Sequence, residues 1–571
     1  MRLPSTERAL LLALAVGVLA VLPYLNGLHG DFTFDDPGVI RDNPMITGEG
    51  AGILPLFTAV YNPGGLYRPL TMVTYLLNAR WGGGVVGYHV VNVLLHAWVS
   101  IAVVCLVAAL FDSAVAGTVA GALFAVHPVH TEAVSGIVGR AELLAALLVC
   151  ASLLAFLRAI RSAGRRPWWL TASAVALALG CLSKESAFVG IPLCLAVYLW
   201  VRYQERVQVP LWTLLPLGLV GIIYLGWRQL LLGSLGVPEV PELLDNPLAH
   251  VPLVPRLETA VVVGWEYLSL LLAPLRLSAD YSFNEVPVVA SIGEPRFVAA
   301  AAVLSVLVLA AMLTARRAPA LLMATAFIAV PLSLTANVVF PIGTIKAERL
   351  LYLPSCGFCM AVGWAAMQVQ RGRRRQAACI FAALVLAFAC RTWVRNWDWS
   401  DNLALFKATV ATAPHSAKAH HNLAAAYEEH GEFDAALAEF HAALAIYPPY
   451  EAAAFGIGRV YEEKGMEDRA LEWYERATAL NWHLAKAHLN AGAIRYRRGE
   501  YAAAEASFRA GLESDPRNPN LLIGLSLVRL AEGDRAQAQA LVEQVAAMRG
   551  NAHTAELVDG MRRMLHDGAQ P

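Results

Sequence analysis

The fold class follows from residues 86–111, which read VGYHVVNVLLHAWVSIAVVCLVAALF and contain no Asp, Glu, Lys or Arg. A helix needs about 20 predominantly apolar residues to cross the hydrocarbon core of a bilayer. The composition of the 571-residue chain agrees, because 57% of its residues are hydrophobic and only 15% are charged. Soluble domains carry about 25% charged residues. The 44 basic and 44 acidic residues cancel, so no net field favours nucleic acid. The sequence therefore predicts a helical membrane protein.

The same hydropathy criterion predicts further spans along most of the first 395 residues. The predicted spans are 9–28, 86–111, 114–128, 136–160, 168–183, 187–203, 211–233, 257–276, 297–315, 319–340, 350–369 and 376–395. Segment 257–276 carries Glu258, Glu266 and Arg276, and we expect it to lie along the interface or to re-enter. Depending on that segment, the chain makes eleven or thirteen crossings.

Basic residues predict the orientation, because Lys and Arg stay on the cytoplasmic side of a membrane. Arg2 and Arg8 place the N-terminus in the cytoplasm. The first span is expected to be an uncleaved anchor, since no clear cleavage site follows it. An odd number of crossings places everything after residue 395 outside the cytoplasm. We therefore expect a transmembrane domain over 1–395, with its first extracytoplasmic loop at 29–85, and an extracytoplasmic domain over 396–571.

The C-terminal domain repeats with a period of 34 residues. Small residues recur at one position of each unit and aromatic residues at another, namely Ala424, Gly458 and Gly492, and Phe440, Tyr474 and Phe508. This is the pattern of the tetratricopeptide repeat (TPR), a helix–turn–helix unit that stacks into an α-solenoid. The units are 417–450, 451–484, 485–518 and 519–552, preceded by a half-repeat at 396–416. The concave face of the solenoid is expected to bind a protein; a passive spacer is the alternative.

Acidic and basic side chains from separate segments fall together on the predicted outer side. They come from the first loop, the second span and the segments HPVHTEAV, SKES, LSADYSFNE and KAER. Polar groups at membrane depth are costly and commonly mark function. The candidate set is Asp35, Asp36, Arg68, His89, His127, His130, Glu132, Arg140, Lys184, Glu185, Asp280, Lys346, Glu348 and Arg349.

Such a set fits group transfer from a phosphate carrier. Asp35 and Asp36 are the candidate catalytic residues, because a carboxylate can take a proton from a hydroxyl. Cationic side chains can bind a phosphate and stabilise it as it leaves. A phosphate at the outer membrane surface, reached laterally, suggests a polyprenyl-phosphate lipid. Any one charged pair can equally be an interhelical ion pair with no catalytic role.

The sequence gives less support to metal or disulfide chemistry. His127, His130 and Glu132 could suggest zinc, but Pro128 interrupts the helix that the zinc-protease spacing needs. All eight cysteines lie in apolar runs, where a disulfide framework is not expected. We expect Cys356 and Cys359 to be packing residues, and predict no metal site.

Several motifs together resemble a known family. They are FDDPGVIRDNP, YRPLTMVTYLLN, GYHVVNVLLH, LFAVHPVHTEAVSGIVGRAELL, LSKES, LSADYSFNE, AERLLYLPSCGF and RTWVRNWDW, followed by TPR units. In this order they resemble the transmembrane and tetratricopeptide-containing O-mannosyltransferases that act on cadherins. The resemblance implies a GT-C glycosyltransferase fold, a mannose donor carried on dolichyl phosphate, and a Ser or Thr hydroxyl acceptor.

The resemblance also implies roles for particular residues. The family's acidic pair falls on Asp35 and Asp36, where an acid acts as a base or orients the acceptor. Lys184 or Arg349 is assigned to the lipid phosphate on charge. A divalent metal assists some GT-C enzymes, and no cofactor is otherwise implied. The short repeat array and the Ala- and Arg-rich composition look bacterial, which leaves open undecaprenyl phosphate as the carrier and a sugar other than mannose.

The resulting hypothesis is an inverting, polyprenyl-phosphate-dependent glycosyltransferase that modifies an extracytoplasmic polypeptide held by the repeats. It would lie in a bacterial inner membrane, or in the endoplasmic reticulum membrane of a eukaryote. Three alternatives stay open. The chain could be a TPR-bearing membrane scaffold without catalysis, a transporter, or a transferase that acts on a lipid acceptor.

Overall fold

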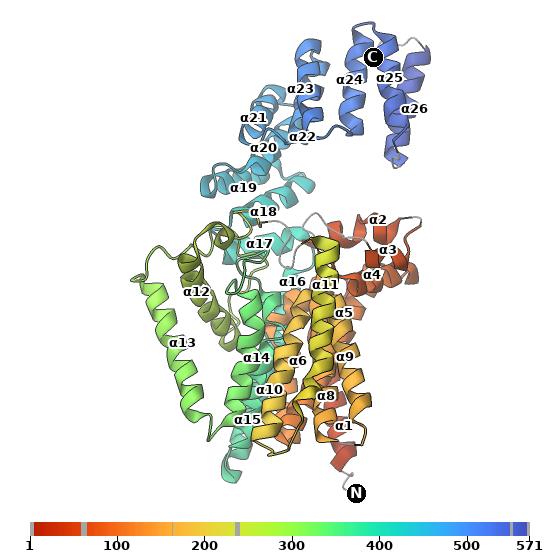
Figure 1. Cartoon of the computed structure of the whole chain (residues 1–571). Helices are drawn as coiled ribbons and strands as arrows, with labels where there is room; N and C mark the ends of the chain where they lie inside the picture. The colour runs from red at the N-terminus through yellow and green to blue at the C-terminus, as the bar shows by residue number, and fades with distance from the viewer. Residues whose placement is uncertain are drawn as a thin grey trace. The chain divides into compact units, whose positions relative to one another are not determined.

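The computed structural model describes residues 5–48, 50–58, 66–162, 164–233, 240–548 and 552–567, and within these ranges every regular element is a helix. The predicted all-α class is therefore confirmed. The chain divides into two compact units, Met1–His415 and Ser416–Pro571, which Figure 1 colours from red to green-blue and from there to blue. The predicted division lay after residue 395. The difference arises because helix α17 (Asn402–Thr412), expected as a half-repeat, makes its contacts with loops of the first unit.

The first unit is a bundle of apolar helices joined by short loops and helical turns. Its helices are α1 (Ser5–Val21), α2 (Pro44–Thr47), α3 (Ile53–Thr58), α4 (Pro69–Trp81), α5 (Gly84–Phe111), α6 (Ala114–Val126), α7 (Thr131–Ser135), α8 (Arg140–Arg161), α9 (Arg166–Ser183), α10 (Gly190–Tyr203), α11 (Leu215–Leu232), α12 (Leu253–Leu272), α13 (Pro295–Thr314), α14 (Pro319–Thr335), α15 (Ser355–Met367), α16 (Arg374–Asp398) and α17. Each predicted span coincides with one of these helices.

Seven described helices are long and apolar enough to cross a membrane, or eight if the bent pair Ala114–Val126 and Pro128–Ser135 forms one span. The chain is thus a multi-pass membrane protein. The count is lower than the predicted eleven to thirteen. By length and composition α9 and α12 are too polar, and α14 and α15 are too short. Residues 257–272 of the segment that we expected not to span lie in α12, with Glu258 and Glu266, and Arg276 lies beyond its end.

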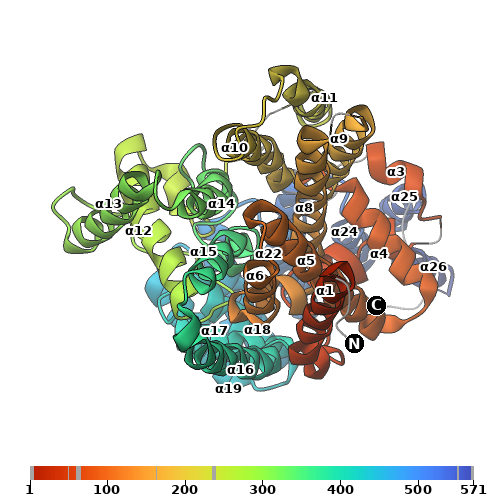
Figure 2. The same ribbon diagram turned by 90° about the horizontal axis from the view of Figure 1, so that it is seen from below.

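Small residues let the central helices of the bundle approach closely. A Cβ added at Gly117 or Gly121 of α6 would lie within 2.5 Å of Val104 of α5. A Cβ on Gly363 of α15 would lie 2.5 Å from the carbonyl oxygen of Ala116. Close backbone approach at small residues is typical of helices that associate in membranes. Figure 2 shows α5, α6 and α15 in the middle of the bundle and α13 at its edge.

The second unit is the predicted repeat array, so the TPR solenoid is confirmed. Its helices are α18 (Ala417–Glu429), α19 (Phe433–Ile446), α20 (Glu451–Glu463), α21 (Glu467–Leu480), α22 (Ala485–Arg497), α23 (Tyr501–Ser514), α24 (Pro519–Ala531), α25 (Arg535–Ala546) and α26 (Ala552–Asp567). Each helix pair turns at a glycine with positive φ, and Gly431, Gly465, Gly499 and Gly533 recur at the 34-residue period. Glycine is favoured there because other residues rarely adopt this conformation.

The small residue at position 8 of each repeat makes room for an aromatic ring. A Cβ at Gly458 would lie 2.5 Å from Cε1 of Tyr474. We expect Gly458→Ala to lower the free energy of unfolding of the array by roughly 1–3 kcal/mol, because the buried ring must move. Thermal unfolding of the full chain measures this. Gly560→Ala, where an added Cβ meets nothing within 4 Å, is the control and should not destabilise the protein. Equal loss in both variants would contradict the packing account.

Candidate functional site

The acidic pair of the first loop splits into two environments. Phe34, just before the pair, has φ of 55°, in the left-handed region. Asp35 is exposed, whereas Asp36 is buried with 1% of its surface accessible. The helical turn η2 (Pro37–Arg41) follows directly. Adjacent carboxylates thus face opposite ways, and only Asp35 is open to a substrate.

Asp36 fastens the first loop to the connection between α7 and α8. Its Oδ1 accepts the backbone N–H of Val138 at 2.8 Å, and its Oδ2 accepts those of Thr33 and Ile137 at 3.2 Å each. Burial raises the pKa of Asp36 to about 7, although the three N–H donors oppose that shift. Both oxygens are occupied by backbone donors, so Asp36 is a structural anchor of the loop.

Asp35 lies beside an ion pair in which Glu132 is buried and Arg349 is half-buried. The Arg349 guanidinium binds Oε1 of Glu132 at 2.6 Å, and the Arg349 backbone N–H donates to Oε2 of the same carboxylate at 2.8 Å. Asp35 lies close enough to interact electrostatically with both partners. The pair joins α7 to the helical turn η8 (Glu348–Leu351). Three segments far apart in the sequence therefore meet at the exposed carboxylate.

Two more ion pairs extend this group. Lys184 pairs with Glu142 of α8, and both side chains are largely buried. Arg68, just before α4, binds Glu185 through Nε at 3.0 Å and Nη2 at 2.5 Å. The pairs are in electrostatic contact, because Lys184 interacts with Arg68, Glu185 and Arg349 as well as with Glu142. We call Asp35, Arg68, Glu132, Glu142, Lys184, Glu185 and Arg349 the charged cluster.

Several predicted site residues lie outside the charged cluster and serve the fold. Arg140 is fully buried and donates to Asn92, Asn78, Thr74 and the carbonyl of Tyr88. His89, His127 and His130 are buried as well, and their ring nitrogens bond the Gly30 carbonyl, the Leu271 carbonyl and the Ser355 hydroxyl respectively. These contacts tie the four side chains to the fold, although the buried Nδ1 of His130 has no hydrogen-bond partner among the described residues.

The remaining predicted residues gather around the loop 278–286. Glu348 Oε1 accepts the Tyr281 hydroxyl at 2.7 Å and the Ser278 N–H at 2.5 Å. Lys346 binds Glu266 of α12 at 2.8 Å and lies over the Tyr281 ring at 4.0 Å from its centroid. Asp280 accepts hydrogen bonds from the backbone and hydroxyl of Ser282. We call these residues the loop network. It borders the charged cluster through the neighbours Glu348 and Arg349.

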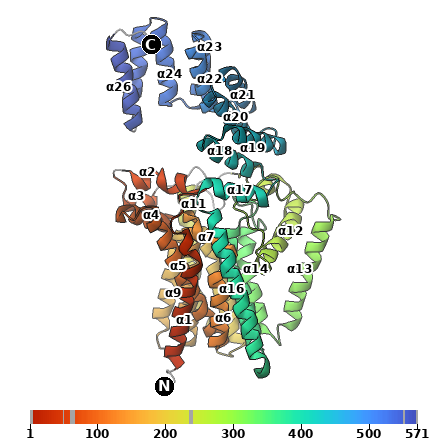
Figure 3. The ribbon, with the colours of Figure 1, turned by 180° about the vertical axis from the view of Figure 1, so that it is seen from behind.

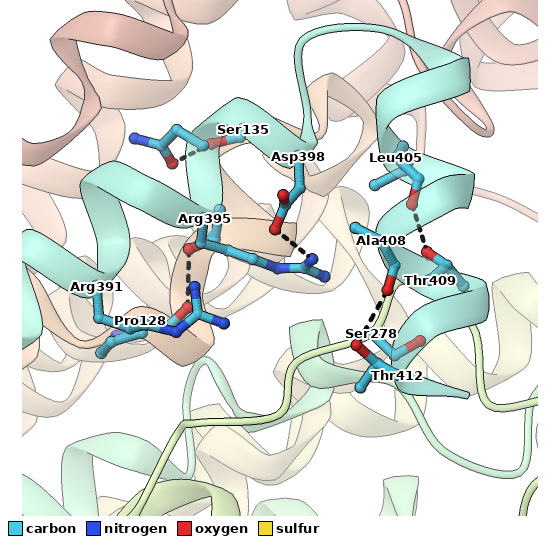
Figure 4. A network of polar contacts seen from close by, with 12 residues as sticks. Pro128, Ser135, Ser278, Arg391, Arg395, Asp398, Leu405, Ala408, Thr409 and Thr412 are labelled. Carbon is cyan, nitrogen blue, oxygen red and sulfur yellow. Dashed lines mark hydrogen bonds and ion pairs between the residues drawn. The ribbon is translucent and has the colours of Figure 1, made fainter. Parts of the chain in front are cut away.

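Arg395 of α16 supplies positive charge to the loop network. It is 1% exposed and binds Asp398 one turn later at 2.8 Å. Figure 4 shows this contact beside Ser135, whose hydroxyl bonds Asn396. Burial raises the pKa of Glu348 to about 7, while the charge of Arg395 opposes the shift. Glu348 is therefore a carboxyl group that titrates near neutral pH.

This pKa gives stability a definite pH dependence. The folded-state pKa of Glu348 lies above its usual value of 4.5, so its contribution is fully present below about pH 4.5 and is lost as pH rises through about 7. We expect Glu348→Gln to flatten the fall in the free energy of unfolding over that range, by at most ~1.4 kcal/mol per pH unit. Unfolding measured from pH 4 to pH 8 in detergent checks this. An unchanged slope would contradict the assignment.

Sequence reasoning omitted three participants from the candidate set. Glu142 pairs with Lys184, Glu266 with Lys346, and Tyr281 with Glu348. Glu142 and Glu266 were visible as charges inside apolar runs, a signal that points to a buried partner. Tyr281 carried no such signal. Among the residues that the structure describes, no group of three or more His, Cys, Asp or Glu side chains is placed to hold a metal ion.

The fold and site define a multi-pass helical membrane protein. Its first unit carries a charged cluster built from loops and helix ends, and its second unit is a TPR array. Three kinds of protein family match successive parts of the chain. Residues 72–227 match the family described as dolichyl-phosphate-mannose-protein mannosyltransferase, and residues 238–308 match "Protein O-mannosyl-transferase TMTC, DUF1736". Residues 417–450, 452–481 and 496–558 match tetratricopeptide repeat families. Four members of the charged cluster, Glu132, Glu142, Lys184 and Glu185, lie within 72–227, whereas Glu266, Asp280 and Tyr281 of the loop network lie within 238–308.

Two animal proteins are similar to this chain over about three quarters of its length. The chain is 29% identical over 487 residues to protein O-mannosyl-transferase TMTC4 of Mus musculus, covering 74% of this chain and 65% of the relative. It is 30% identical over 470 residues to protein O-mannosyl-transferase TMTC3 of Homo sapiens, covering 75% and 50%. The chain thus spans one half to two thirds of the length of these relatives. The predicted resemblance to the TMTC family of O-mannosyltransferases is confirmed.

Proposed function

We propose that this protein transfers a sugar, mannose in the first instance, from a polyprenyl-phosphate carrier to Ser or Thr hydroxyls of an extracytoplasmic polypeptide. The observation that carries the proposal is the position of Asp35. It is an exposed carboxylate beside the Arg349–Glu132 pair, in a chain similar to O-mannosyl-transferases. A base next to cationic side chains is what transfer from a phosphate to a hydroxyl requires.

In the proposed reaction Asp35 accepts the proton of the acceptor hydroxyl. The hydroxyl oxygen forms a bond to the anomeric carbon while the bond from that carbon to the phosphate oxygen breaks. The lipid phosphate leaves with the bonding electrons, and the configuration at the anomeric carbon inverts. Arg349 and Lys184 are the proposed phosphate ligands. Asp36 has no chemical role in this scheme and keeps the loop in place.

The acidic partners of the cations fit this scheme. Glu132, Glu142 and Glu185 balance Arg349, Lys184 and Arg68, because buried charges are costly without a partner. A phosphate that enters the charged cluster adds negative charge and competes for the same donors. Release of the lipid phosphate then restores the ion pairs, which favours turnover over tight product binding.

The proposal includes a location and an acceptor. The N-terminus is proposed to lie in the cytoplasm, with the charged cluster and the TPR array outside it, in a bacterial inner membrane or an endoplasmic reticulum membrane. The repeats are proposed to hold the acceptor polypeptide and so raise its concentration at Asp35. The carrier is proposed to be dolichyl or undecaprenyl phosphate.

Glycoproteomics tests the function in cells. A strain that lacks the protein is complemented with the wild type or with Asp35→Asn, and membrane and exported proteins are searched for hexose on Ser and Thr. The proposal expects peptides whose hexose appears only with the wild type. A scaffold role predicts equal modification by both. Sugar found on lipids alone would replace the protein acceptor by a lipid acceptor.

A further inference from the structure

The residue before Asp35 is held in an unusual backbone conformation. Phe34 has φ of 55°, and a bulky L-residue in the left-handed region is an outlier that its surroundings must maintain. This conformation determines where the next two side chains point, because Phe34 directly precedes Asp35, which is exposed, and Asp36, which is buried. A relaxed Phe34 would rotate the carboxylates of Asp35 and Asp36 relative to the Arg349–Glu132 pair.

The contacts that hold Phe34 come from the segment after the last membrane helix. Oδ1 of Asn402 accepts the Phe34 N–H at 2.9 Å, and the Ser400 carbonyl accepts the Asp31 N–H at 2.8 Å. The Phe34 ring meets Phe406 edge to face, with 5.9 Å between centroids. Trp399 and Leu405 complete the apolar cluster around Phe34 together with Ala279. One side chain therefore fixes the backbone of Phe34, and another fixes its ring.

The helix that supplies these contacts is itself braced. Asp401 caps the start of α17 by accepting the Ala404 N–H at 2.8 Å. Beyond its end, the backbone of His415 donates to Glu285 at 3.0 Å and accepts from Asn284 at 2.8 Å. Within the helix the hydroxyls of Thr409 and Thr412 turn back onto carbonyls of the preceding turn (Figure 4). Figure 3 shows α17 following directly on α16.

We infer that Asn402 and Phe406 of α17 are positioning residues that hold Phe34 in its left-handed conformation and thereby aim Asp35 at the Arg349–Glu132 pair. This inference rests on the proposed role of Asp35. The segment predicted as a half-repeat, which contains α17, is then part of the transfer site. This role explains why α17 packs with the first unit. Neither residue contacts a reacting atom; both act through the backbone of Phe34.

The test uses Asn402→Ala in the purified full chain. Removing the acceptor should make the peptide over residues 31–37 exchange backbone hydrogen about tenfold faster. It should lower kcat for sugar transfer from polyprenyl-phosphate mannose by about tenfold or more and leave KM for the donor unchanged. Asn402→Asp keeps an oxygen acceptor at this position and should restore both values. The control is Thr412→Val, which should change neither, because the Thr412 hydroxyl donates to the carbonyl of Ala408 in its own helix.

The two readouts separate this inference from the proposed function. Unchanged exchange over residues 31–37 in Asn402→Ala would overturn the positioning role whatever the activity. Faster exchange with wild-type kcat, in a protein that Asp35→Asn inactivates, would also overturn it. If Asp35→Asn keeps full activity, the proposed role of Asp35 fails instead and the positioning inference falls with it.

Discussion

Asp35→Asn is expected to lower kcat for sugar transfer by about 10²–10⁴ and to leave folding intact. The amide has nearly the shape of the carboxylate but cannot accept the proton of the acceptor hydroxyl. Because Asp35 is exposed, its replacement should change the free energy of unfolding by no more than about 0.5 kcal/mol. Transfer from a purified polyprenyl-phosphate sugar and thermal unfolding of the same preparation measure the two effects.

Asp36→Asn is the matched control, because it makes the same chemical change one residue later. Its amide nitrogen must face at least one of the N–H donors that now bind the two carboxylate oxygens. A buried N–H group that loses its acceptor lowers the free energy of unfolding by roughly 1–3 kcal/mol. We therefore expect a lower midpoint of thermal unfolding. Activity lost only in Asp36→Asn, with Asp35→Asn fully active, would contradict the assignment of the base.

Arg140→Met is expected to have the largest effect on stability. Arg140 is fully buried at the start of α8. Its Nε donates to Asn92 at 2.8 Å and its Nη1 to Asn78 at 2.7 Å, and its guanidinium lies 4.8 Å from the centroid of the Tyr75 ring. Methionine is apolar and donates no hydrogen bond, so these buried acceptors would lose their donor. Each buried acceptor left without a donor costs roughly 1–3 kcal/mol, and unfolding in detergent measures the total loss.

Arg158→Met tests whether the loss of stability comes from the buried position of Arg140 or would follow the removal of any arginine from α8. Arg158 lies in the last turn of the same helix, is exposed, and stacks over Trp169 at 5.0 Å. Its loss should cost no more than about 1 kcal/mol. Arg140→Lys keeps the charge but cannot reproduce the fork of donors, so it should recover only part of the stability. Full stability of Arg140→Met would show that Arg140 is not structural.

The sequence was most informative where one physical requirement dominates. Apolar runs must form helices in a bilayer because every backbone group needs an internal partner, and each predicted span coincides with a helix. The 34-residue period placed the repeat helices, because a small residue such as Gly458 must recur opposite a ring such as Tyr474. The number of membrane crossings was harder to predict, because the sequence of a short or charged helix such as α15 or α12 does not show whether that helix crosses the membrane.

The candidate site was predictable as a set of residue types but not as a geometry. The pattern found Arg349 and Lys184, yet ion pairs join residues as distant as Glu132 and Arg349, and only the fold decides which charges meet. It could not separate Asp35 from Asp36 either. Their difference depends on the left-handed φ of Phe34, which is set by Asn402 far along the chain. Tertiary contact determined both outcomes.

The most direct measurement is transfer by the purified full-length protein in lipid nanodiscs. Radiolabelled mannose on dolichyl or undecaprenyl phosphate is supplied with a Ser- and Thr-containing polypeptide, and the product is identified by mass spectrometry. The account predicts hexose on a Ser or Thr hydroxyl, formed by the wild type and by the Thr412→Val control, and reduced at least 100-fold in Asp35→Asn. Label that stays on the carrier with every acceptor polypeptide, or equal transfer by the wild type and Asp35→Asn, would contradict it.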